Sequence, residues 1–192
     1  MAKLSFYYSV MGGGKTTYLI QTEYAYRQKG FKTLILKPTV DDREGAHHGW
    51  GPISSRVVAS QQQALYVDAI TPEVLNGLDY NMIFVDELQF FTPQDVGVLA
   101  DIADKQDIPV MCYGLKTDVN GHLFDGSAAL LAVADEIKEI EYPCACGRKA
   151  THHIRKIDGK IDTTDLTIAV EKGNITYEAV CRQCWKSARK NG

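Results

Sequence analysis

The sequence lacks any apolar run long enough to cross a membrane, and it lacks an excess of basic residues. A membrane-spanning helix needs about 20 consecutive apolar residues, and no segment of the 192 residues approaches that length. The formal net charge is −3, whereas proteins that read duplex DNA or RNA usually carry a basic face. Residues 1–4 show no apolar signal-peptide core. We therefore expect a cytoplasmic protein without a membrane partner and without a polymeric nucleic-acid partner.

Cysteine is scarce, and its placement indicates a metal site. Of the five cysteines, Cys112 stands alone in an apolar run, which predicts a buried core thiol. The other four form two close pairs late in the chain, and in a reducing compartment such pairs favour a metal over a disulfide. Structural zinc takes four tetrahedral ligands, often from two close pairs. The predicted zinc ligands are Cys144, Cys146, Cys181 and Cys184.

Other interpretations of these cysteines remain open at this point. The four thiols are alternatively reduced and without metal, or they include a redox pair. His152 and His153 lie nearby as alternative ligands, but four cysteines already complete the coordination shell and the two histidines suit a hairpin strand better. Because no coordination position is left open, we expect a structural zinc and not a catalytic one.

Over the first 142 residues, apolar strand-like runs alternate with segments of helical periodicity. Thr92 and Pro93 supply a helix N-cap and a proline at the first helical position. This alternation predicts an α/β fold with a mostly parallel sheet covered by helices. The expected strands are 4–8, 33–36, 82–85, 110–113 and 137–142, and the expected helices are 16–29, one that opens at 92–93, and 127–134.

Two segments interrupt this alternation. Residues 43–52 are rich in Gly and His without an apolar period, which predicts a long loop. After Pro143 the four cysteines, an Asp158-Gly159 hairpin signal and short β-rich stretches indicate a separate small domain. We therefore expect one domain at 1–142 and a second at 143–192.

A glycine-rich segment follows the first expected strand and opens the first expected helix, which is the context of a phosphate-binding loop. Glycines let backbone N–H groups approach phosphates, and the helix N-terminus favours anions. In such loops the lysine reaches the β- and γ-phosphates, and the threonine hydroxyl binds Mg²⁺. Ser9 stands where the motif has its first glycine, and a glycine-rich turn without a ligand is the alternative. The candidate ATP-binding residues here are Ser9, Val10, Met11, Gly12, Gly13, Gly14, Lys15 and Thr16.

An acidic pair, Asp86 and Glu87, ends the apolar run at 82–85. Ligands of open α/β sheets bind at the C-terminal ends of the strands, so we expect this pair and the glycine-rich loop at one edge. Asp86 stands where a carboxylate holds Mg²⁺, with Thr16 as the other protein ligand. Glu87 is placed to accept a proton from an attacking hydroxyl or water, which makes it the candidate catalytic base. A solvated acidic turn that caps the strand is the alternative.

The local chemistry of these motifs fits hydrolysis as well as phosphoryl transfer. One rival function is a P-loop ATPase with a zinc ribbon that acts on nucleic acid, but the small size and the absent basic face weigh against it. Another is a nucleotide-binding regulator without turnover, and a base beside the magnesium carboxylate weighs against that function.

The sequence resembles the type II thymidine kinases, the cytosolic zinc-containing class, over nearly its whole length. The most specific block is Val85-Asp86-Glu87-Leu88-Gln89-Phe90, which occurs together with the two cysteine pairs. The other matching segments are Phe6-Tyr7-Tyr8-Ser9, Asp41-Asp42-Arg43, Cys112-Tyr113-Gly114-Leu115-Lys116-Thr117-Asp118, Cys144-x-Cys146-Gly147-Arg148-Lys149-Ala150 and Tyr177-x-x-x-Cys181-x-x-Cys184.

The resemblance implies a RecA-like P-loop core with a small C-terminal zinc-binding lasso domain that closes over the nucleoside. It implies an ATP:thymidine 5′-phosphotransferase that forms dTMP and ADP and uses ATP, Mg²⁺ and a structural Zn²⁺. Members of the family are commonly homotetramers and are inhibited by thymidine triphosphate (dTTP).

The resemblance also implies roles for individual residues. Glu87 looks like the catalytic base on the 5′-hydroxyl of the nucleoside. The ATP site is expected to include Asp86, Glu87, Leu88 and Gln89, and the nucleoside pocket is expected to include Met11, Leu115, Phe124, Val170 and Tyr177. The chain departs from the family at Val119, where phenylalanine is usual, and at Glu171-Lys172-Gly173, where Ile-Gly-Gly is usual. These departures bear on nucleoside affinity and not on the phosphoryl chemistry.

Overall fold

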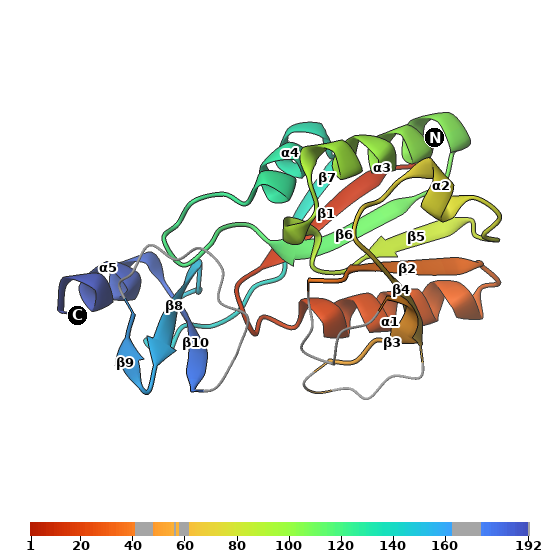
Figure 1. Cartoon of the computed structure of the whole chain (residues 1–192). Coiled ribbons are helices and arrows are strands. Elements are labelled where there is room, and N and C mark those ends of the chain that lie inside the picture. The colour runs from red at the N-terminus through yellow and green to blue at the C-terminus, as the bar shows by residue number, and fades with distance from the viewer. Residues whose placement is uncertain (41–47, 56, 58–61, 163–173, 192) are drawn as a thin grey trace.

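The structure of the protein, a computed structural model, describes residues 1–40, 48–55, 57, 62–162 and 174–191. Within these residues a seven-stranded sheet forms the centre of the larger part of the molecule (Figure 1). All neighbouring strands run parallel except β3 and β4, which are antiparallel. In sheet order the strands are β3 (Gly49–Pro52), β4 (Gln63–Val67), β2 (Thr33–Pro38), β5 (Met82–Val85), β6 (Val110–Leu115), β1 (Leu4–Ser9) and β7 (Glu136–Glu139).

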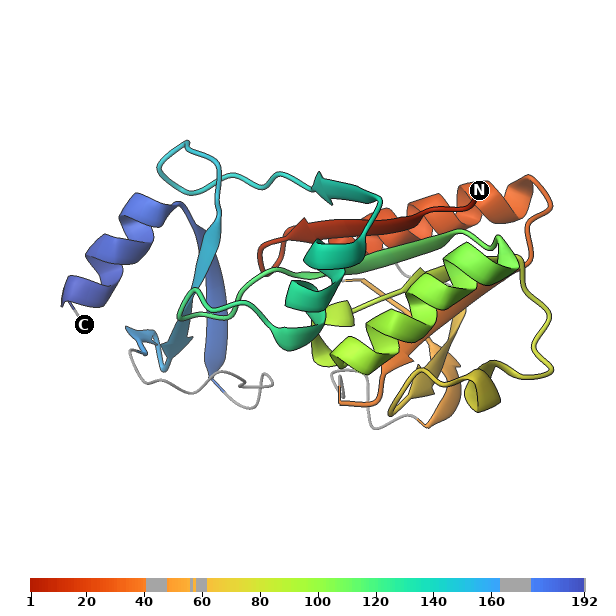
Figure 2. The same cartoon turned by 90° about the horizontal axis from the view of Figure 1, so that it is seen from above.

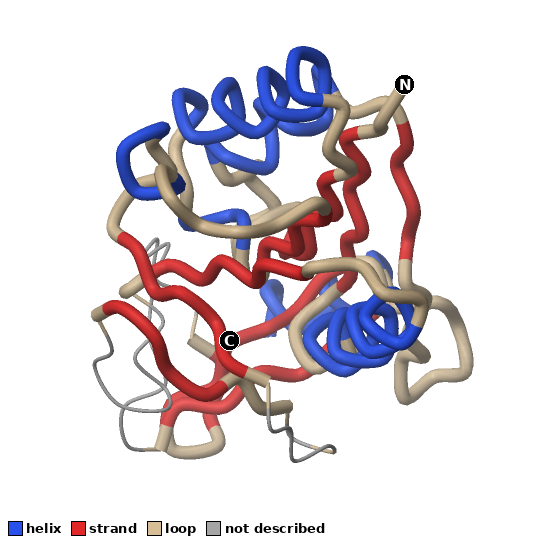
Figure 3. The backbone as a smooth tube through the Cα atoms, turned by 90° about the vertical axis from the view of Figure 1, so that its right-hand side faces the viewer, coloured by secondary structure: helices blue, strands red, loops and turns tan. Residues whose placement is uncertain are grey.

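Helices cover both faces of this sheet, as Figure 3 shows in end view. Helix α1 (Lys15–Gln28) lies on one face, and α3 (Pro93–Gln106) and α4 (Asp125–Val133) lie together on the other. Two shorter helices, α2 (Pro72–Leu75) and the 3₁₀ helix η1 (Leu88–Phe90), follow β4 and β5. No helix in the described part of the chain is long and apolar enough to cross a membrane. The mostly parallel α/β core predicted from the sequence is confirmed.

Local sequence signals explain several of these elements. All four residues of β5 are buried, as expected for a central strand that is covered on both faces. At the start of α3, the Thr92 hydroxyl accepts a hydrogen bond from the amide of Asp95, whose carboxylate accepts from the amide of Thr92. This capping box and the proline at the first helical position confirm the predicted start of the helix. Cys112 is fully buried in β6, also as predicted.

The C-terminal ends of the parallel strands meet at one edge of the sheet. Ser9, at the end of β1, lies directly opposite Leu115, at the end of β6. Val85, at the end of β5, lies opposite Cys112 of β6. This edge faces the smaller C-terminal part of the molecule, as Figures 1 and 2 show. The fold thus places the loop after β1 and the acidic pair after β5 between the two parts.

The smaller part contains, within the described residues, a three-stranded antiparallel sheet and a terminal helix at the end of the molecule opposite the N-terminus (Figure 2). Asp158 and Gly159 both have positive φ angles, 50° and 78°, in the turn between the first two of these strands. The hairpin predicted from these two residues is confirmed. The elements are β8 (His152–Ile157), β9 (Lys160–Ile161), β10 (Ile175–Val180) and α5 (Arg182–Asn191).

Three expectations about the core differ from the structure. The predicted loop at 43–52 ends in strand β3, which pairs with β4, a strand that the sequence did not indicate; residues 41–47 lie outside the described residues. Helix α2 was not expected either. The last core strand is shorter than predicted and begins at Glu136. Strand β3 has no apolar alternation of its own, and it is a strand because it pairs with β4.

Candidate active site and zinc centre

The phosphate-binding loop makes a tight turn between β1 and α1. Gly14 has a left-handed backbone conformation with φ 77° immediately before the helix, which L side chains rarely adopt. The amide of Gly13 donates a hydrogen bond of 3.1 Å to the carbonyl of Val10. A Cβ at Gly13 would lie 2.0 Å from Oγ of Ser9. A side chain at Gly13 would collide with Ser9, so this tight turn requires glycine, as expected for a loop whose backbone approaches phosphate closely.

The structure brings the two candidate magnesium ligands together although they lie far apart in the sequence. Thr16, in the first turn of α1, places Oγ1 3.0 and 3.3 Å from the two carboxylate oxygens of Asp86 after β5. Asp86 is fully buried. A carboxylate and a hydroxyl at the end of a phosphate-binding loop are the protein groups that Mg²⁺ uses in P-loop enzymes. The donor set therefore fits this ion.

Lys15 points back over the loop that precedes it. Its Nζ lies 3.1 Å from the carbonyl oxygen of Val10, and the side chain is buried. An ammonium held at this place adds positive charge to a turn that already exposes backbone amides and a helix N-terminus. These features together favour binding of a polyphosphate.

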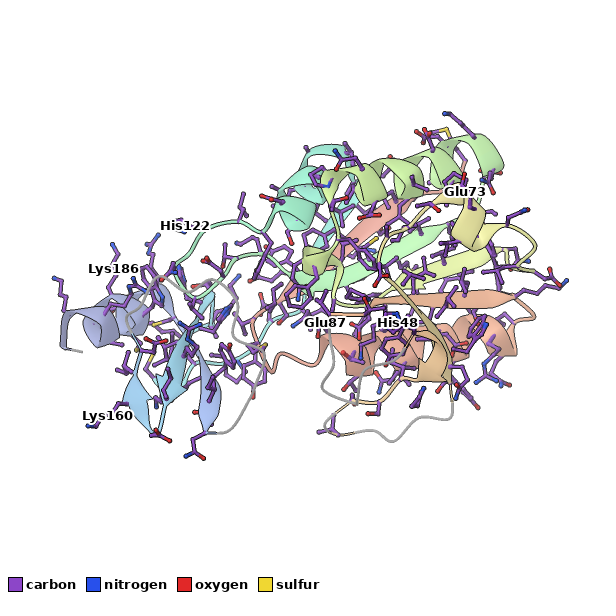
Figure 4. The ribbon with its side chains drawn as sticks, viewed as in Figure 1. His48, Glu73, Glu87, His122, Lys160 and Lys186 are labelled. Atoms are coloured by element: carbon purple, nitrogen blue, oxygen red, sulfur yellow. The ribbon has the colours of Figure 1, made fainter. Side chains whose placement is uncertain are left out.

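Glu87 adopts an unusual backbone conformation beside Asp86. Its φ and ψ angles are 49° and 41°, a left-handed conformation that is uncommon for residues other than glycine. The side chain is buried, and its carboxylate accepts a hydrogen bond of 2.6 Å from Nε2 of Gln89. Figure 4 shows Glu87 at the edge of the sheet that faces the smaller part of the molecule. Strain of this kind is concentrated at functional sites, where the surrounding structure maintains it.

Gln89 connects this carboxylate to the end of β6. Its Nε2 donates to Glu87, while its Oε1 accepts a hydrogen bond of 2.9 Å from the amide of Leu115. The carbonyl of Leu115 in turn accepts a 2.5 Å bond from the hydroxyl of Ser127 in α4. The predicted ATP-site residue Leu88 instead has its side chain fully buried in the apolar core. Gln89 therefore joins the carboxylate of Glu87 to the end of β6, a contact that the sequence motif did not indicate.

The expected nucleoside-pocket residues come from both parts of the molecule. Leu115 ends β6, and the ring of Phe124 packs edge to face against Phe90, with centroids 6.1 Å apart. Met11 is partly exposed in the phosphate-binding turn. Tyr177 lies on β10 of the C-terminal sheet. Val170, like Glu171-Lys172-Gly173 and Arg43, lies outside the described residues.

A small cavity of about 10 Å³ lies where the C-terminal sheet meets the phosphate-binding loop. His153 of β8 contributes to its lining and is 4% exposed, and its Nδ1 is buried without a hydrogen-bond partner among the described residues. Burial, assisted by the positive charge of Lys15, lowers the pKa of His153 to about 4. The cavity is lined by Tyr8, Ser9, Val10, Lys116, Thr117, Glu139, Thr151 and His153.

The four cysteines predicted to bind zinc form a single cluster. Their sulfur atoms all lie within 4.8 Å of one another. The distances from Cys146 to Cys144 and to Cys181 are 3.4 and 3.7 Å, and sulfurs arranged tetrahedrally at zinc–sulfur distances of 2.3 Å would lie about 3.8 Å apart. The amide of Cys184 donates to Sγ of Cys181 and helps to lower the pKa of that thiol to about 6, which favours the metal-binding thiolate. The cluster therefore fits a tetrahedral zinc ion.

The sequence did not indicate the positions of His153 and Trp185. A histidine in a predicted strand is as compatible with an exposed face as with the buried position of His153. Trp185 follows a cysteine and resembles any aromatic residue of an amphipathic helix, yet its indole Nε1 donates a 3.0 Å hydrogen bond to the carbonyl of Val119, in the loop between β6 and α4. Both roles arise where the two parts of the molecule meet.

Comparison with known proteins extends these observations to nearly the whole chain. Residues 2–185 match the sequence model of the family "Thymidine kinase". Thymidine kinase from Ruegeria pomeroyi is 40% identical over 98% of this chain and 96% of the relative. The Legionella pneumophila enzyme is 41% identical over 97% and 90%, and the Haemophilus influenzae enzyme is 42% identical over 97% of each chain.

Among solved structures, Bacteroides Pif1 bound to single-stranded DNA matches 72% of this chain at a TM-score of 0.39 and 15% identity. That likeness is too weak to bear on function. The relatives, in contrast, match over at least 90% of their length, and the phosphate-binding loop, the acidic pair and the cysteine cluster all lie within residues 2–185, which the family matches. The chain belongs to the thymidine kinase family.

Proposed function

We propose that this protein transfers the γ-phosphate of ATP to the 5′-hydroxyl of thymidine, forming dTMP and ADP. The structural observation that carries the proposal is the contact of Thr16 with Asp86 at 3.0 Å beside the buried carboxylate of Glu87. This contact joins a phosphate-binding loop to a magnesium carboxylate and a base at one edge of the sheet. Membership of the thymidine kinase family identifies the acceptor.

Each residue of this edge has a defined task in the transfer. The amides of the loop and the Lys15 ammonium hold the β- and γ-phosphates and offset the negative charge of the transition state. The 5′-oxygen forms a bond to the γ-phosphorus, while the bond from the γ-phosphorus to the bridging oxygen breaks and ADP leaves. The hydroxyl proton passes to the carboxylate of Glu87, which Gln89 orients.

Two metal ions complete the proposal. Thr16 and Asp86 would hold Mg²⁺, which neutralises phosphate charge when bound. Cys144, Cys146, Cys181 and Cys184 would hold a structural Zn²⁺ that stabilises the C-terminal sheet and α5. Met11, Leu115, Phe124, Val170 and Tyr177 are the residues that we propose to contact the nucleoside.

A P-loop ATPase that acts on nucleic acid is not favoured. The relatives are thymidine kinases, and the match covers 96% and 90% of their lengths. Glu87 is buried at the edge of the core sheet, where its carboxylate accepts a hydrogen bond from Gln89. A base beside a magnesium carboxylate also argues against a regulator without turnover.

A phosphoryl-transfer assay tests the proposal directly. Purified protein is incubated with Mg²⁺-ATP and, in separate reactions, with each deoxynucleoside, and ADP and nucleoside monophosphate are both measured. We expect dTMP and ADP in equal amounts with thymidine and little ADP without a nucleoside. ADP release that single-stranded DNA stimulates, without dTMP, would support the ATPase instead.

Several further properties are proposals that follow from the family resemblance. We propose a division into a core at 1–142 and a lasso domain at 143–192, a cytoplasmic location, a homotetramer and inhibition by dTTP. Light scattering would measure the assembly, for which we expect four times the 21.3 kDa of the chain. Initial rates at increasing dTTP would measure the inhibition.

A further inference from the structure

The loop between β6 and α4, residues 116–124, is a compact unit. Thr117 and Leu123 form an isolated antiparallel bridge at its base. Oδ1 of Asp118 accepts hydrogen bonds from the amides of Asn120 and His122, at 2.9 and 2.8 Å. These hydrogen bonds connect the tip of the loop to its base. A contact that holds the tip therefore also restrains the residues at the base.

Helix α5 of the C-terminal part holds the tip of this loop. Nε1 of Trp185 donates a 3.0 Å hydrogen bond to the carbonyl of Val119. The guanidinium of Arg189, one turn further along α5, donates a 2.8 Å bond to Oδ1 of Asn120. Val119 is buried at this contact. The two bonds join elements that are more than 60 residues apart in the sequence.

The indole of Trp185 is itself fixed from two sides. The ring of His152 in β8 lies 4.8 Å away, centroid to centroid. On the same ring, Cζ of Arg189 lies 5.1 Å from the centroid, within cation–π distance. This packing limits the rotamers of Trp185 and directs its N–H group at the loop. We call Trp185 and Arg189 the α5 clamp.

The clamp is tied to the cysteine cluster through the start of α5. The amide of Trp185 donates a 2.9 Å hydrogen bond to the carbonyl of Cys181, and Cys184 is its immediate neighbour in the chain. Order in the cluster therefore fixes the first turn of α5 and, with it, the indole.

The base of the same loop lies at the candidate active site. Leu115 precedes the loop and bonds through its amide to Gln89, which orients Glu87. Phe124 ends the loop and packs against Phe90. In Figure 4 the loop, marked by His122, extends from the core toward α5, marked by Lys186.

We propose that Trp185 and Arg189 are positioning residues for the nucleoside: by holding the tip of loop 116–124 they place Leu115 and Phe124 before thymidine arrives. A loop that is already ordered loses less conformational entropy on binding, so the affinity for the ligand rises. This inference rests on the proposed function and on Leu115 and Phe124 as nucleoside contacts. On this inference, the zinc centre supports nucleoside binding partly by ordering α5, in addition to its proposed role in the lasso domain.

Steady-state kinetics of two variants test the clamp. Trp185→Phe keeps an aromatic ring between His152 and Arg189 and removes the N–H donor, and Arg189→Gln removes the cation and alters the bond to Asn120. A hydrogen bond contributes about 0.5–1.5 kcal/mol net, so we expect KM for thymidine to rise by about 2-fold to 12-fold in Trp185→Phe. KM for ATP and kcat should stay within about twofold, since the hydrogen bonds of the two clamp side chains go to loop 116–124 and not to the phosphate-binding loop. Lys186→Met, an exposed change on α5, is the matched control and should behave as the wild type.

Hydrogen exchange gives a second readout that does not depend on activity. In the zinc-loaded protein we expect the amides of peptide 117–124 to exchange faster in Trp185→Phe and in Arg189→Gln than in the wild type and Lys186→Met. Zinc content, measured on the same samples, should be equal in all four proteins. Faster exchange confined to this peptide and to α5 is the signature of a released loop.

Several outcomes would overturn the clamp. One is an unchanged thymidine KM in both variants, and another is an unchanged exchange rate in 117–124. A parallel rise of both KM values with loss of zinc would also overturn it, because it would mark general damage and not positioning. Failure of the wild type to phosphorylate thymidine would instead refute the proposed function, and the exchange experiment would still decide whether α5 holds the loop.

Discussion

At the scale of single residues, the left-handed backbone conformation of Glu87 determines where its carboxylate lies. The left-handed turn at φ 49° directs the chain from β5 into η1 and leaves the carboxylate beside Asp86 and under Gln89. A glycine would adopt this conformation more easily but would carry no carboxylate. The unfavourable backbone conformation is therefore tolerated because this position needs a carboxylate.

Replacing Glu87 by glutamine tests its role as the base. Gln has nearly the same shape and cannot accept the hydroxyl proton, and general-base catalysis typically contributes about 10²–10⁴-fold. We expect kcat to fall by that factor while KM for thymidine changes only a few-fold. Glu73→Gln, the same change at an exposed site far from the candidate active site (Figure 4), should leave kcat unchanged. A near-normal kcat for Glu87→Gln would assign proton transfer to another group.

Lys15 carries the charge of the phosphate-binding loop. Lys15→Met keeps the length of the side chain and removes the ammonium, so we expect phosphoryl transfer to fall by at least about 10²-fold. The circular dichroism spectrum should be unchanged, because the backbone of the loop is set by its glycines. Lys29→Met, at the exposed end of α1, serves as the control. Normal turnover by Lys15→Met would refute the assignment of the phosphate-binding loop.

At the scale of elements, strand β8 carries a histidine that ties stability to pH. His153 has a pKa of about 4 in the folded protein, against 6.5 for an unperturbed histidine, because burial disfavours the imidazolium. Between these values the unfolded chain binds the proton first. Protonation therefore favours unfolding, and stability falls as the pH drops from about 6.5 toward 4.

Chemical denaturation at several pH values measures this effect. The shift corresponds to a loss of about 3 kcal/mol from His153 alone on going from pH 7 to pH 4. His153→Gln cannot titrate, so its free energy of unfolding should depend less on pH over this range. His122→Gln, at a histidine whose side chain is 79% exposed, is the control and should follow the wild type. Identical pH profiles for wild type and His153→Gln would contradict the assigned role.

At the scale of the whole molecule, the two sheets face each other across the edge that carries the candidate active site (Figure 2). The core carries the phosphate-binding loop and the acidic pair, and the C-terminal part carries α5 and Tyr177, which we propose to contact the nucleoside. The zinc centre lies in the C-terminal part, where Cys144 and Cys181 share an apolar cluster with Val10 of the phosphate-binding loop. Because we propose that the C-terminal part closes over the nucleoside, we expect loss of zinc to weaken nucleoside binding more than ATP binding.

Cys181→Ser tests this selectivity. We expect zinc to fall well below one per chain, KM for thymidine to rise more than KM for ATP, and α5 to lose protection from hydrogen exchange. Cys112→Ala removes the cysteine that lies outside the cluster and should retain a full complement of zinc. Equal loss of affinity for both substrates in Cys181→Ser would contradict a selective effect of the zinc centre on nucleoside binding.

The sequence alone determined the chemistry whose signals are local. The glycine-rich turn, the acidic pair after a buried strand and the two cysteine pairs each lie within a few residues, and such patterns carry their own steric and ligand requirements. The class of fold followed from the alternation of apolar runs and helical periods. Burial of β5 and the capping box of α3 agree with these signals because local propensity and tertiary packing favour the same structure.

Tertiary structure alone decided the features that depend on contacts between distant segments. Strand β3 exists through its pairing with β4, and His153 is buried because the C-terminal sheet packs against the loop after β1. The orientation of Glu87 depends on Gln89 and the end of β6, and the α5 clamp depends on a loop more than 60 residues away. No residue in these pairs is distinctive by itself. Their roles arise from proximity in space, which the spacing of residues along the chain does not encode.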